Sequence, residues 1–248
     1  MDLATASFLV DLRKLQLEQA LTLLQQGRYP LPPRVEGNGE AWLQAVLDGL
    51  CDLSLRDALT GLTNRRHFRA VLEREIDRVA RTGESALLLI LDIDHFKRIN
   101  DTYGHESGDQ VIQAVGVRLS DSVRPMDTVA RYGGEEFAIM LPNCQPTFGS
   151  AVAERVRVAI EAQPVKLTSG HEVHITASVG GAYAPQWVRS SASLWMERAD
   201  LQLYCAKTEG RNRVCLEQAA ISSVSAEEKG MLFGLGAHHS DAQDASDE

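Results

Sequence analysis

Cysteine is scarce in this sequence. Its four cysteines, at positions 51, 144, 205 and 215, form no Cys-x-x-Cys pair. Without such a pair, the spacing predicts neither a zinc site nor a redox dithiol. Scattered cysteines without a disulfide framework are typical of a reducing compartment, so we expect a cytoplasmic protein.

Long apolar runs are also absent. The densest run, Ala86 to Leu91, is far too short to cross a bilayer, which takes about 20 apolar residues. The N-terminal segment MDLATASFLVDLRK has no basic region ahead of its apolar residues, so it does not resemble a signal peptide. We therefore expect neither a transmembrane segment nor secretion.

Positive charge is in deficit as well. Lysine and arginine number 25 against 34 acidic residues, which gives a net charge of −9. This balance excludes the broad basic surface of a nucleic-acid-binding protein. A phosphate-rich ligand would have to be held by local basic residues and a metal ion.

The 248 residues divide into three segments. Residues 1–52 contain leucines at helical spacing, with helices predicted over 2–26 and 40–55 around a loop rich in proline and glycine. Residues 53–217 alternate between helix and strand patterns and are predicted to form the main domain. Residues 218–248 are acidic and are predicted to be a disordered tail.

The main domain is predicted to have an α+β fold. Helices are predicted over residues 64–82, 109–120, 150–162 and 191–207. Strands are predicted over residues 86–92, 129–132, 136–141, 173–179 and 214–216, the first fully buried and the fourth with one solvated face. The order β-α-β-β-α-β is the ferredoxin-like arrangement, here with an antiparallel-containing central sheet and an N-terminal helical extension.

An apolar stripe precedes this domain. It consists of Leu43, Val46, Leu47, Leu50 and Leu53, at near-heptad spacing. A lone helix of this length is marginal in water, so the stripe requires a partner. We expect two copies of the chain to pair through it; packing against the chain's own domain, or against another protein, is the alternative.

Two acidic clusters follow predicted strands. The stretch Asp92-Ile93-Asp94 ends the most buried strand, and Glu135-Glu136 follows a Gly-Gly turn. Strand ends are where ligand sites of α/β sheets gather, and oxygen ligands suit Mg²⁺. The two clusters are either a metal site or ordinary turn carboxylates.

Basic and polar residues favour the first interpretation. Lys97, Lys207 and Arg211 could hold phosphates, while Asn100 and Asp109 could bind a purine edge. A carboxylate accepts both hydrogen bonds that the N1–H and amino group of guanine donate, and adenine offers no such pair. The set therefore favours GTP over ATP.

Four motifs carry a family resemblance. They are DALTGLTNRRHF (57–68), DIDHFKRINDTYGHESGD (92–109), RYGGEEF (131–137) and AKTEGRNRV (206–214). Together they resemble the motifs of GGDEF diguanylate cyclases, over about two thirds of the chain. The resemblance implies a palm-type fold and a dimeric enzyme that condenses two GTP molecules into cyclic di-GMP and two pyrophosphates.

The resemblance also implies roles for single residues. Mg²⁺, or Mn²⁺ as a substitute, would be held by Asp92, Glu135 and the carbonyl of Ile93. The catalytic residues would be Asp92, Lys97, Glu135 and Glu136. GTP would be bound by Asn100, His105, Asp109, Gly133, Gly134, Lys207 and Arg211, with Lys97 close to the phosphates. Glu135 replaces the Asp of the family's name, and family members use either carboxylate.

A second site is implied by Arg124 and Asp127. They form an Arg-x-x-Asp motif five residues before the Gly-Gly turn, the spacing of the family's product-inhibition site. Arg155 stands where a neighbouring subunit contributes an arginine in some relatives. The alternative from another functional class is a non-catalytic receptor or scaffold that binds cyclic di-GMP through this motif alone.

Overall fold

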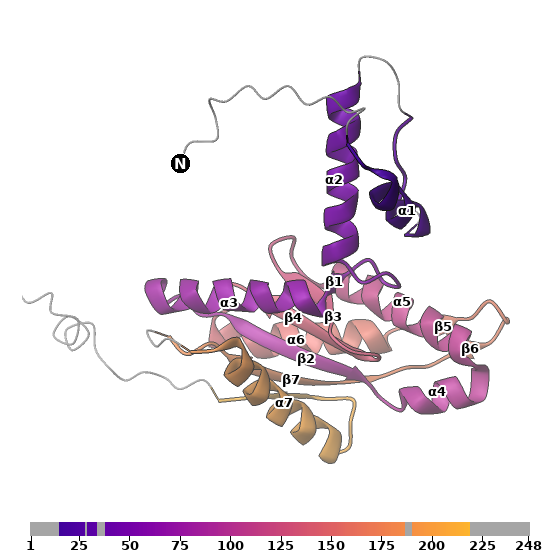
Figure 1. Ribbon diagram of the computed structural model, residues 1–248. Coiled ribbons are helices and arrows are strands. Elements are labelled where there is room, and N and C mark those ends of the chain that lie inside the picture. The colour runs from indigo at the N-terminus through magenta and orange to yellow at the C-terminus, as the bar shows by residue number, and fades with distance from the viewer. Residues whose placement is uncertain (1–14, 28, 34–37, 187–189, 219–248) are drawn as a thin grey trace, which may run out of the picture. The chain divides into compact units, whose positions relative to one another are not determined.

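The computed structural model describes residues 15–27, 29–33, 38–186 and 190–218 (Figure 1). A mixed six-stranded sheet has the strand order β1-β3-β4-β2-β7-β8. Its strands are β1 (Thr63–Asn64), β2 (Leu87–Ile93), β3 (Thr128–Arg131), β4 (Glu136–Leu141), β7 (Ala177–Tyr183) and β8 (Val214–Leu216). A separate two-stranded ribbon consists of β5 (Val165–Lys166) and β6 (Glu172–Val173).

Helices cover both faces of the sheet. They are α1 (Glu18–Gln26), α2 (Gly39–Leu55), α3 (Arg65–Thr82), α4 (Phe96–Tyr103), α5 (His105–Ser122), α6 (Pro146–Glu161) and α7 (Ala192–Thr208). Helices α3 and α7 share one core cluster with β2, β4 and β7, while α6 approaches Leu87 on the opposite face. Among the described helices, none combines the length and the apolar character needed to cross a membrane.

The predicted ferredoxin-like core is confirmed. Strands β3, β4, β2 and β7 lie side by side, and every neighbouring pair among them is antiparallel. The two outer strands are additions, since β1 pairs in parallel with β3 and β8 pairs in parallel with β7. The sheet therefore brings the end of β2 between the β3–β4 hairpin and the start of β7.

Strand β2 is central and buried on both faces, as its unbroken apolar sequence predicts. The prediction for the fourth strand was wrong in extent and exposure. The expected strand over 173–179 is split, and its main part, β7, is buried along its whole length. Gly180 allows this burial, because a Cβ there would lie 2.0 Å from the Leu203 nitrogen of α7. The alternation of apolar with polar residues predicted a solvated face, but the polar Ser178 is buried and donates a hydrogen bond to Asp94.

The segment after β2 holds a helix that was not predicted. Helix α4 begins after His95, whose φ of 57° is left-handed, and ends at Gly104, with φ of 83°. Helix α5 then starts at His105, one turn before the predicted residue 109. The short helix escaped prediction because only Phe96 and Ile99 mark its buried face.

The N-terminal helices pack against each other. Trp42 and Val46 of α2 form a small core with Leu24 of α1. Gly49 sits at their contact, where a Cβ would lie 2.6 Å from the Leu24 side chain. The predicted stripe is therefore only partly right, because Val46 faces α1 whereas Leu47 remains 48% exposed. Residues 1–14 of the first predicted helix, and residues 219–248 of the predicted tail, lie outside the described residues.

Candidate active site

The end of β2 places Asp92 beside the Gly-Gly hairpin. Antiparallel pairing sets Asp92 opposite Glu136 of β4 on one side and Ser178 of β7 on the other. The Ile93 N–H donates to the Glu135 carbonyl oxygen at 3.3 Å. The two acidic clusters that the sequence separates by about forty residues thus meet because β2 pairs with β4.

Lys207 lies directly against Asp92. Its Nζ is 2.8 Å from Asp92 Oδ2, and the two side chains are 33% and 15% exposed, respectively. A carboxylate this buried is costly unless a cation or hydrogen-bond donors compensate it. The end of α7 supplies that cation, so a predicted phosphate-binding residue and a predicted metal ligand are in contact.

Negative charge exceeds positive charge around this pair. Partial burial raises the pKa of Glu136, and the carboxylates of Asp92 and Asp200 raise it further. Lys207 opposes the shift, and Glu135 adds to it. Asp200 was not predicted as a site residue; it lies seven residues before Lys207 on α7, a helical spacing that returns to the same face. Such a surplus favours binding of a divalent cation.

The donor set fits Mg²⁺. Asp92 and Glu135 offer carboxylate oxygens, and Ile93 offers a backbone carbonyl, all of them hard ligands. Among the described residues, three metal-ligating side chains come close together only at the end of α7, and not at Asp92. Mg²⁺ does not require such a group, because it is commonly held by one or two carboxylates, with water and substrate phosphates completing its octahedron.

Asp94 has a different task from Asp92. Its side chain is buried and accepts hydrogen bonds from Thr176 Oγ1 and Ser178 Oγ, each at 2.7 Å. It also accepts from the backbone N–H of Asn212 at 3.0 Å. Asp94 therefore ties the turn after α7, which includes Arg211, to the sheet. Sequence reasoning predicted Arg211 as a site residue but did not reveal this role of Asp94.

That turn has an unusual backbone. Arg211 and Asn212 have φ values of 61° and 46°, in the left-handed region that non-glycine residues rarely adopt. The Asn212 side chain donates to Glu161 at 2.9 Å, and the Arg211 N–H donates to the Ala206 carbonyl at 3.0 Å. The turn is thereby fixed from both ends, which leaves the Arg211 side chain exposed near Lys207 at the end of α7.

The Gly-Gly hairpin is held by Arg131. Its Nη2 donates to the Gly134 carbonyl at 2.9 Å, and its Nη1 lies 3.3 Å from Asp57 Oδ1. A Cβ on Gly133 would come within 2.3 Å of Glu136 Oε2, whereas a Cβ on Gly134 would meet nothing within 4 Å. Gly133 makes room for the carboxylate, and Gly134 leaves the backbone open to a ligand. The role of Arg131 was missed from sequence.

The predicted purine-binding residues lie where α4 meets α5. Asn100 Oδ1 is buried and has no hydrogen-bond partner among the described residues. Gly108 packs against it so closely that a Cβ would lie 1.9 Å from this oxygen. His105 and Asp109 are exposed on the same end of α5, and Lys97 is exposed in the first turn of α4. An orphaned buried acceptor calls for a donor, as an N–H-bearing purine edge would provide.

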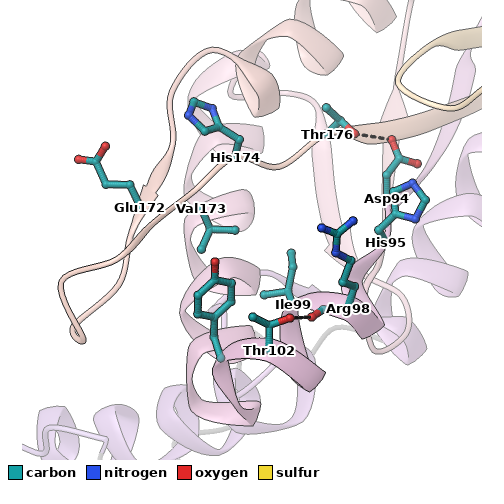
Figure 2. A pocket seen from close by; sticks show the side chains of 10 residues that line it. Asp94, His95, Arg98, Ile99, Thr102, Glu172, Val173, His174 and Thr176 are labelled. Atoms are coloured by element: carbon teal, nitrogen blue, oxygen red, sulfur yellow. Dashed lines mark hydrogen bonds between the residues drawn. The ribbon is translucent and has the colours of Figure 1, made fainter.

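A cavity of about 360 Å³ opens beside α4 (Figure 2). It is lined by Asp94, His95, Arg98, Ile99, Thr102, Tyr103, Glu172, Val173, His174 and Thr176. None of the residues assigned to nucleotide or metal from the sequence is among them. The cavity is therefore distinct from the Asn100 site.

The Arg-x-x-Asp motif forms a separate site. Asp127 has a fully buried side chain and accepts from the Arg124 backbone N–H at 2.8 Å. Within the part of the chain that the structure describes, its Oδ1 has no hydrogen-bond partner. Both residues line a cavity of about 330 Å³. Burial raises the pKa of the Cys144 thiol, and the charges of Arg124 and Arg155 lower it. Arg124, Asp127 and Arg155 therefore all lie close to Cys144.

Comparison with known proteins agrees with this architecture. The family described as diguanylate cyclase, GGDEF domain, matches residues 54–213. The chain is 39% identical over 168 residues to diguanylate cyclase DosC of Escherichia coli K12, covering 66% of this chain and 35% of DosC. It spans less than half the length of DosC and of several other curated relatives.

Two solved structures are similar. One is the coiled coil and GGDEF domain of DgcB from Caulobacter crescentus in complex with c-di-GMP, with a TM-score of 0.66, 37% identity, and coverage of 71% of this chain and 92% of that one. The other is the active GGEEF domain of a diguanylate cyclase from Vibrio cholerae, with a TM-score of 0.57, 30% identity, and coverage of 62% and 97%. The chain belongs to the diguanylate cyclase GGDEF-domain family.

Proposed function

We propose that this protein is a diguanylate cyclase, which condenses two GTP molecules into cyclic di-GMP and two pyrophosphates. One observation carries the proposal: Asp92 faces Glu136 across paired strands and lies 2.8 Å from Lys207. A carboxylate proposed to hold the metal ion, a carboxylate proposed to accept the proton and a cation proposed to bind phosphate thus lie together. The names of DosC and of the Vibrio cholerae domain support the same activity.

The reaction joins two nucleotides. The 3′-hydroxyl of each GTP forms a bond to the α-phosphorus of the other. In each of these two displacements the bond from that phosphorus to pyrophosphate breaks and the hydroxyl proton is lost, which closes the ring and releases two pyrophosphates. Mg²⁺, or Mn²⁺ in its place, would neutralise charge on the phosphates. Asp92, Glu135 and the Ile93 carbonyl would hold that ion. Glu136, whose pKa is raised, is suited to accept the proton.

Three cations would hold the triphosphate. Lys207 contacts Asp92 at 2.8 Å and would bind a phosphate oxygen of a nucleotide held beside that carboxylate. Arg211 is presented by a turn whose backbone is fixed by hydrogen bonds, so little backbone freedom is lost on binding. Lys97, exposed at the start of α4, would complete the set.

The guanine base would be bound between α4 and α5. The buried Asn100 Oδ1 meets no donor from the described ranges of the chain, and guanine supplies N–H donors on its Watson–Crick edge. Asp109 would accept from the same edge, and His105 would line the pocket. ATP would leave these acceptors unpaired, which typically costs a factor of about 10⁴ or more in discrimination.

Catalysis would require two copies of the chain. Each domain supplies one GTP site and the product has two identical halves, so two domains must face each other around a two-fold axis. Helix α2 offers a surface for this pairing, because Leu47 and Leu55 remain 48% and 37% exposed on it. The DgcB structure includes a coiled coil together with its GGDEF domain, which supports the same arrangement here.

The α2 surface gives a direct test. Leu47→Lys should weaken dimerisation on the order of 10²-fold, since each copy loses a buried leucine worth roughly 1.5 kcal/mol. Sedimentation at several protein concentrations measures this shift. Asp48→Lys is the matched control, because Asp48 is an exposed polar neighbour on α2. Equal dimer affinity in the two variants would exclude pairing through Leu47.

The second site would bind the product. Arg124 is half exposed beside the buried Asp127, whose free Oδ1 can accept from guanine. An arginine can grip guanine or phosphate with two hydrogen bonds. Arg155, whose charge acts on the same Cys144 thiol as that of Arg124, would join them. The DgcB structure, a complex with c-di-GMP, supports a product-binding role for this family.

Arg124→Ala should relieve product inhibition. Losing a charged hydrogen-bond donor costs about 1.5–3 kcal/mol, so the inhibitory concentration of cyclic di-GMP should rise about 10- to 100-fold. Initial rates with added product measure the change. Arg74→Ala, at an exposed arginine of α3, is the control and should stay inhibited. Unchanged inhibition in Arg124→Ala would place the inhibitory site elsewhere.

Turnover itself distinguishes the enzyme from a receptor. Purified protein with GTP and Mg²⁺ should yield cyclic di-GMP and pyrophosphate by product chromatography. A non-catalytic receptor would bind cyclic di-GMP at Arg124 and form none from GTP. The absence of product at high protein concentration, where dimers are populated, would contradict the proposed function.

A further inference from the structure

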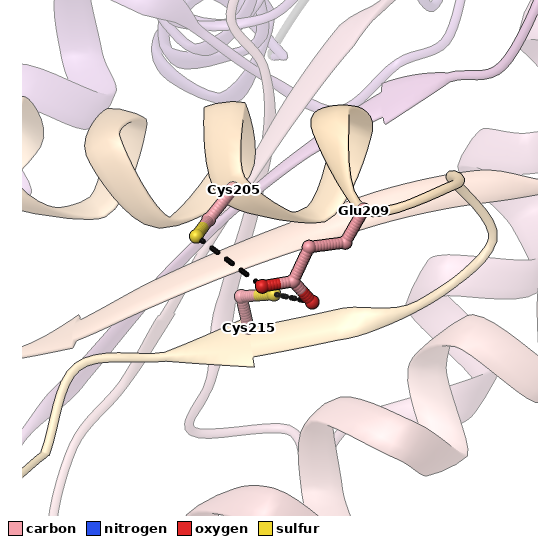
Figure 3. Close-up of side chains that lie close together, drawn as sticks. All are labelled: Cys205, Glu209 and Cys215. Carbon is pink, nitrogen blue, oxygen red and sulfur yellow. Dashed lines mark hydrogen bonds between the residues drawn. The ribbon is translucent and has the colours of Figure 1, made fainter.

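Two thiols and a carboxylate converge where α7 ends and β8 begins (Figure 3). They belong to Cys205, Glu209 and Cys215, and their ligand atoms all lie within 4.8 Å of one another. We propose that these three side chains form a binding site for a thiophilic divalent cation, and that Zn²⁺ is the ion that fits it. The site is separate from the Mg²⁺ site proposed at Asp92 and does not depend on the proposed function.

The fold explains why the three residues meet. Cys205 and Glu209 are four residues apart at the end of α7, so they share one helix face. The tight turn over residues 210–213 then sends the chain back as β8, which pairs with β7 through Gly180 and Cys215. Cys215 is thereby placed below the last turn of α7, as Figure 3 shows.

The distances suit a tetrahedral ion. Cys205 Sγ is 3.7 Å from Glu209 Oε1, and Cys215 Sγ is 4.0 Å from Glu209 Oε2. Zinc bonds of about 2.3 Å to sulfur and 2.0 Å to oxygen, at a tetrahedral angle, separate the two ligands by about 3.5 Å. One ligand atom from each of the three residues lies within 4.8 Å of the other two, so shifts of about an ångström in these side chains would complete the geometry.

The ligand chemistry selects the metal. Thiolates are soft ligands that favour Zn²⁺, whereas Mg²⁺ and Ca²⁺ require oxygen ligands. Three protein ligands leave a fourth position, which solvent can fill because Glu209 is exposed and both thiols are partly so. Arg213 Nη1 lies 3.2 Å from Glu209 Oε2, but the two side chains are 45% and 53% exposed, so this ion pair is weak. A zinc ion could therefore replace Arg213 as the partner of Glu209.

Zinc titration of the full chain tests the site. The protein is reduced, stripped with EDTA, and titrated with Zn²⁺ against a chromogenic zinc chelator. We expect one tightly bound Zn²⁺ per chain. The zinc affinity of Cys205→Ser/Cys215→Ser should be at least about 100-fold lower, because losing a ligand should weaken metal binding at least as much as losing a residue that only orients a ligand. The zinc affinity of Glu209→Gln should lie between that of the wild type and that of the double cysteine variant.

Two controls address the other candidate ligands. Cys51→Ser/Cys144→Ser removes the remaining thiols and should bind as the wild type does. His238→Ala/His239→Ala removes a histidine pair that lies outside the described residues, and should also bind normally. Co²⁺ in place of Zn²⁺ should give a thiolate-to-cobalt absorption band in the wild-type protein.

The outcomes decide the proposal. Wild-type binding no tighter than that of Cys205→Ser/Cys215→Ser, or binding lost only with His238 and His239, would overturn it. A cobalt spectrum without a thiolate band would do the same. The spectrum uses the unaltered protein, so the test holds even where the double variant fails to fold.

Discussion

Replacing Glu135 with Gln is expected to lower the rate of cyclic di-GMP formation by at least about 10³-fold. The substitution keeps the size of the side chain and removes one of the two charges proposed to hold Mg²⁺. A metal ion contributes several kcal/mol of charge stabilisation in such reactions, and each 1.4 kcal/mol is a factor of ten in rate. Asp92→Asn should have a similar effect.

The fold should survive the loss of the Glu135 charge. Glu135 and Glu136 are neighbours near Asp92 and Asp200, so removing one carboxylate relieves repulsion. Thermal unfolding of Glu135→Gln should therefore match that of the wild type. Glu73→Gln, at an exposed carboxylate of α3, controls for loss of charge alone and should keep full activity.

Magnesium dependence separates metal binding from other roles. If Glu135 binds the ion, a higher Mg²⁺ concentration should recover part of the activity of Glu135→Gln. The same treatment should not recover Lys97→Ala, whose defect would lie in phosphate binding. An activity of Glu135→Gln within tenfold of the wild type at physiological Mg²⁺ would remove Glu135 from the metal site.

The parts of this fold that sequence predicts are those with strong local signals. The apolar run that ends at Asp92 predicted β2, and the Gly133-Gly134 pair predicted the hairpin, whose strands pair as expected. Both signals arise within a few residues. The meeting of Asp92 with Glu136 also followed, because a β-α-β-β order places these strands side by side.

Other features depend on contacts that sequence does not display. Asp94 follows Asp92 by two residues, yet its partners Thr176, Ser178 and Asn212 are more than eighty residues away. The burial of β7 depends on α7 packing over Gly180, which reads as a strand-weakening residue in isolation. Local sequence patterns therefore located Asp94 and β7 but could not predict which residues contact them.

The N-terminal stripe shows the same limit. Spacing alone treats Val46 and Leu47 as one apolar face, but adjacent residues on a helix point about 100° apart. Helix α1 covers Val46 and leaves Leu47 exposed. The leucines of α2 that are available to pair with a second copy of the chain therefore depend on where α1 packs against α2.

Gly108 is expected to control nucleotide selectivity although it carries no side chain. In Gly108→Ala, the new Cβ would lie 1.9 Å from Asn100 Oδ1, so the Asn100 side chain must turn away. The oxygen proposed to accept from guanine would leave its position. We expect the KM for GTP to rise about 10²-fold and the preference for GTP over ATP, about 10⁴-fold, to narrow by a similar factor.

Gly116→Ala is the matched control in the same helix. A Cβ at Gly116 would meet its nearest atoms, in Leu62 and Thr60, at 3.4 Å, an ordinary contact. Alanine is favoured over glycine in a helix interior by up to about 1 kcal/mol, so this variant should be more stable and equally active. Chemical denaturation and steady-state kinetics on both variants compare the two effects.

A double-mutant cycle assigns the Gly108 effect to Asn100. If Gly108→Ala acts by displacing that side chain, combining it with Asn100→Ala should add little to the loss caused by Asn100→Ala alone. Independent, additive losses in GTP affinity would instead show that the new methyl group disturbs the site through Phe96, whose ring would lie 3.1 Å from it. The two mechanisms therefore predict different KM values for the same double variant.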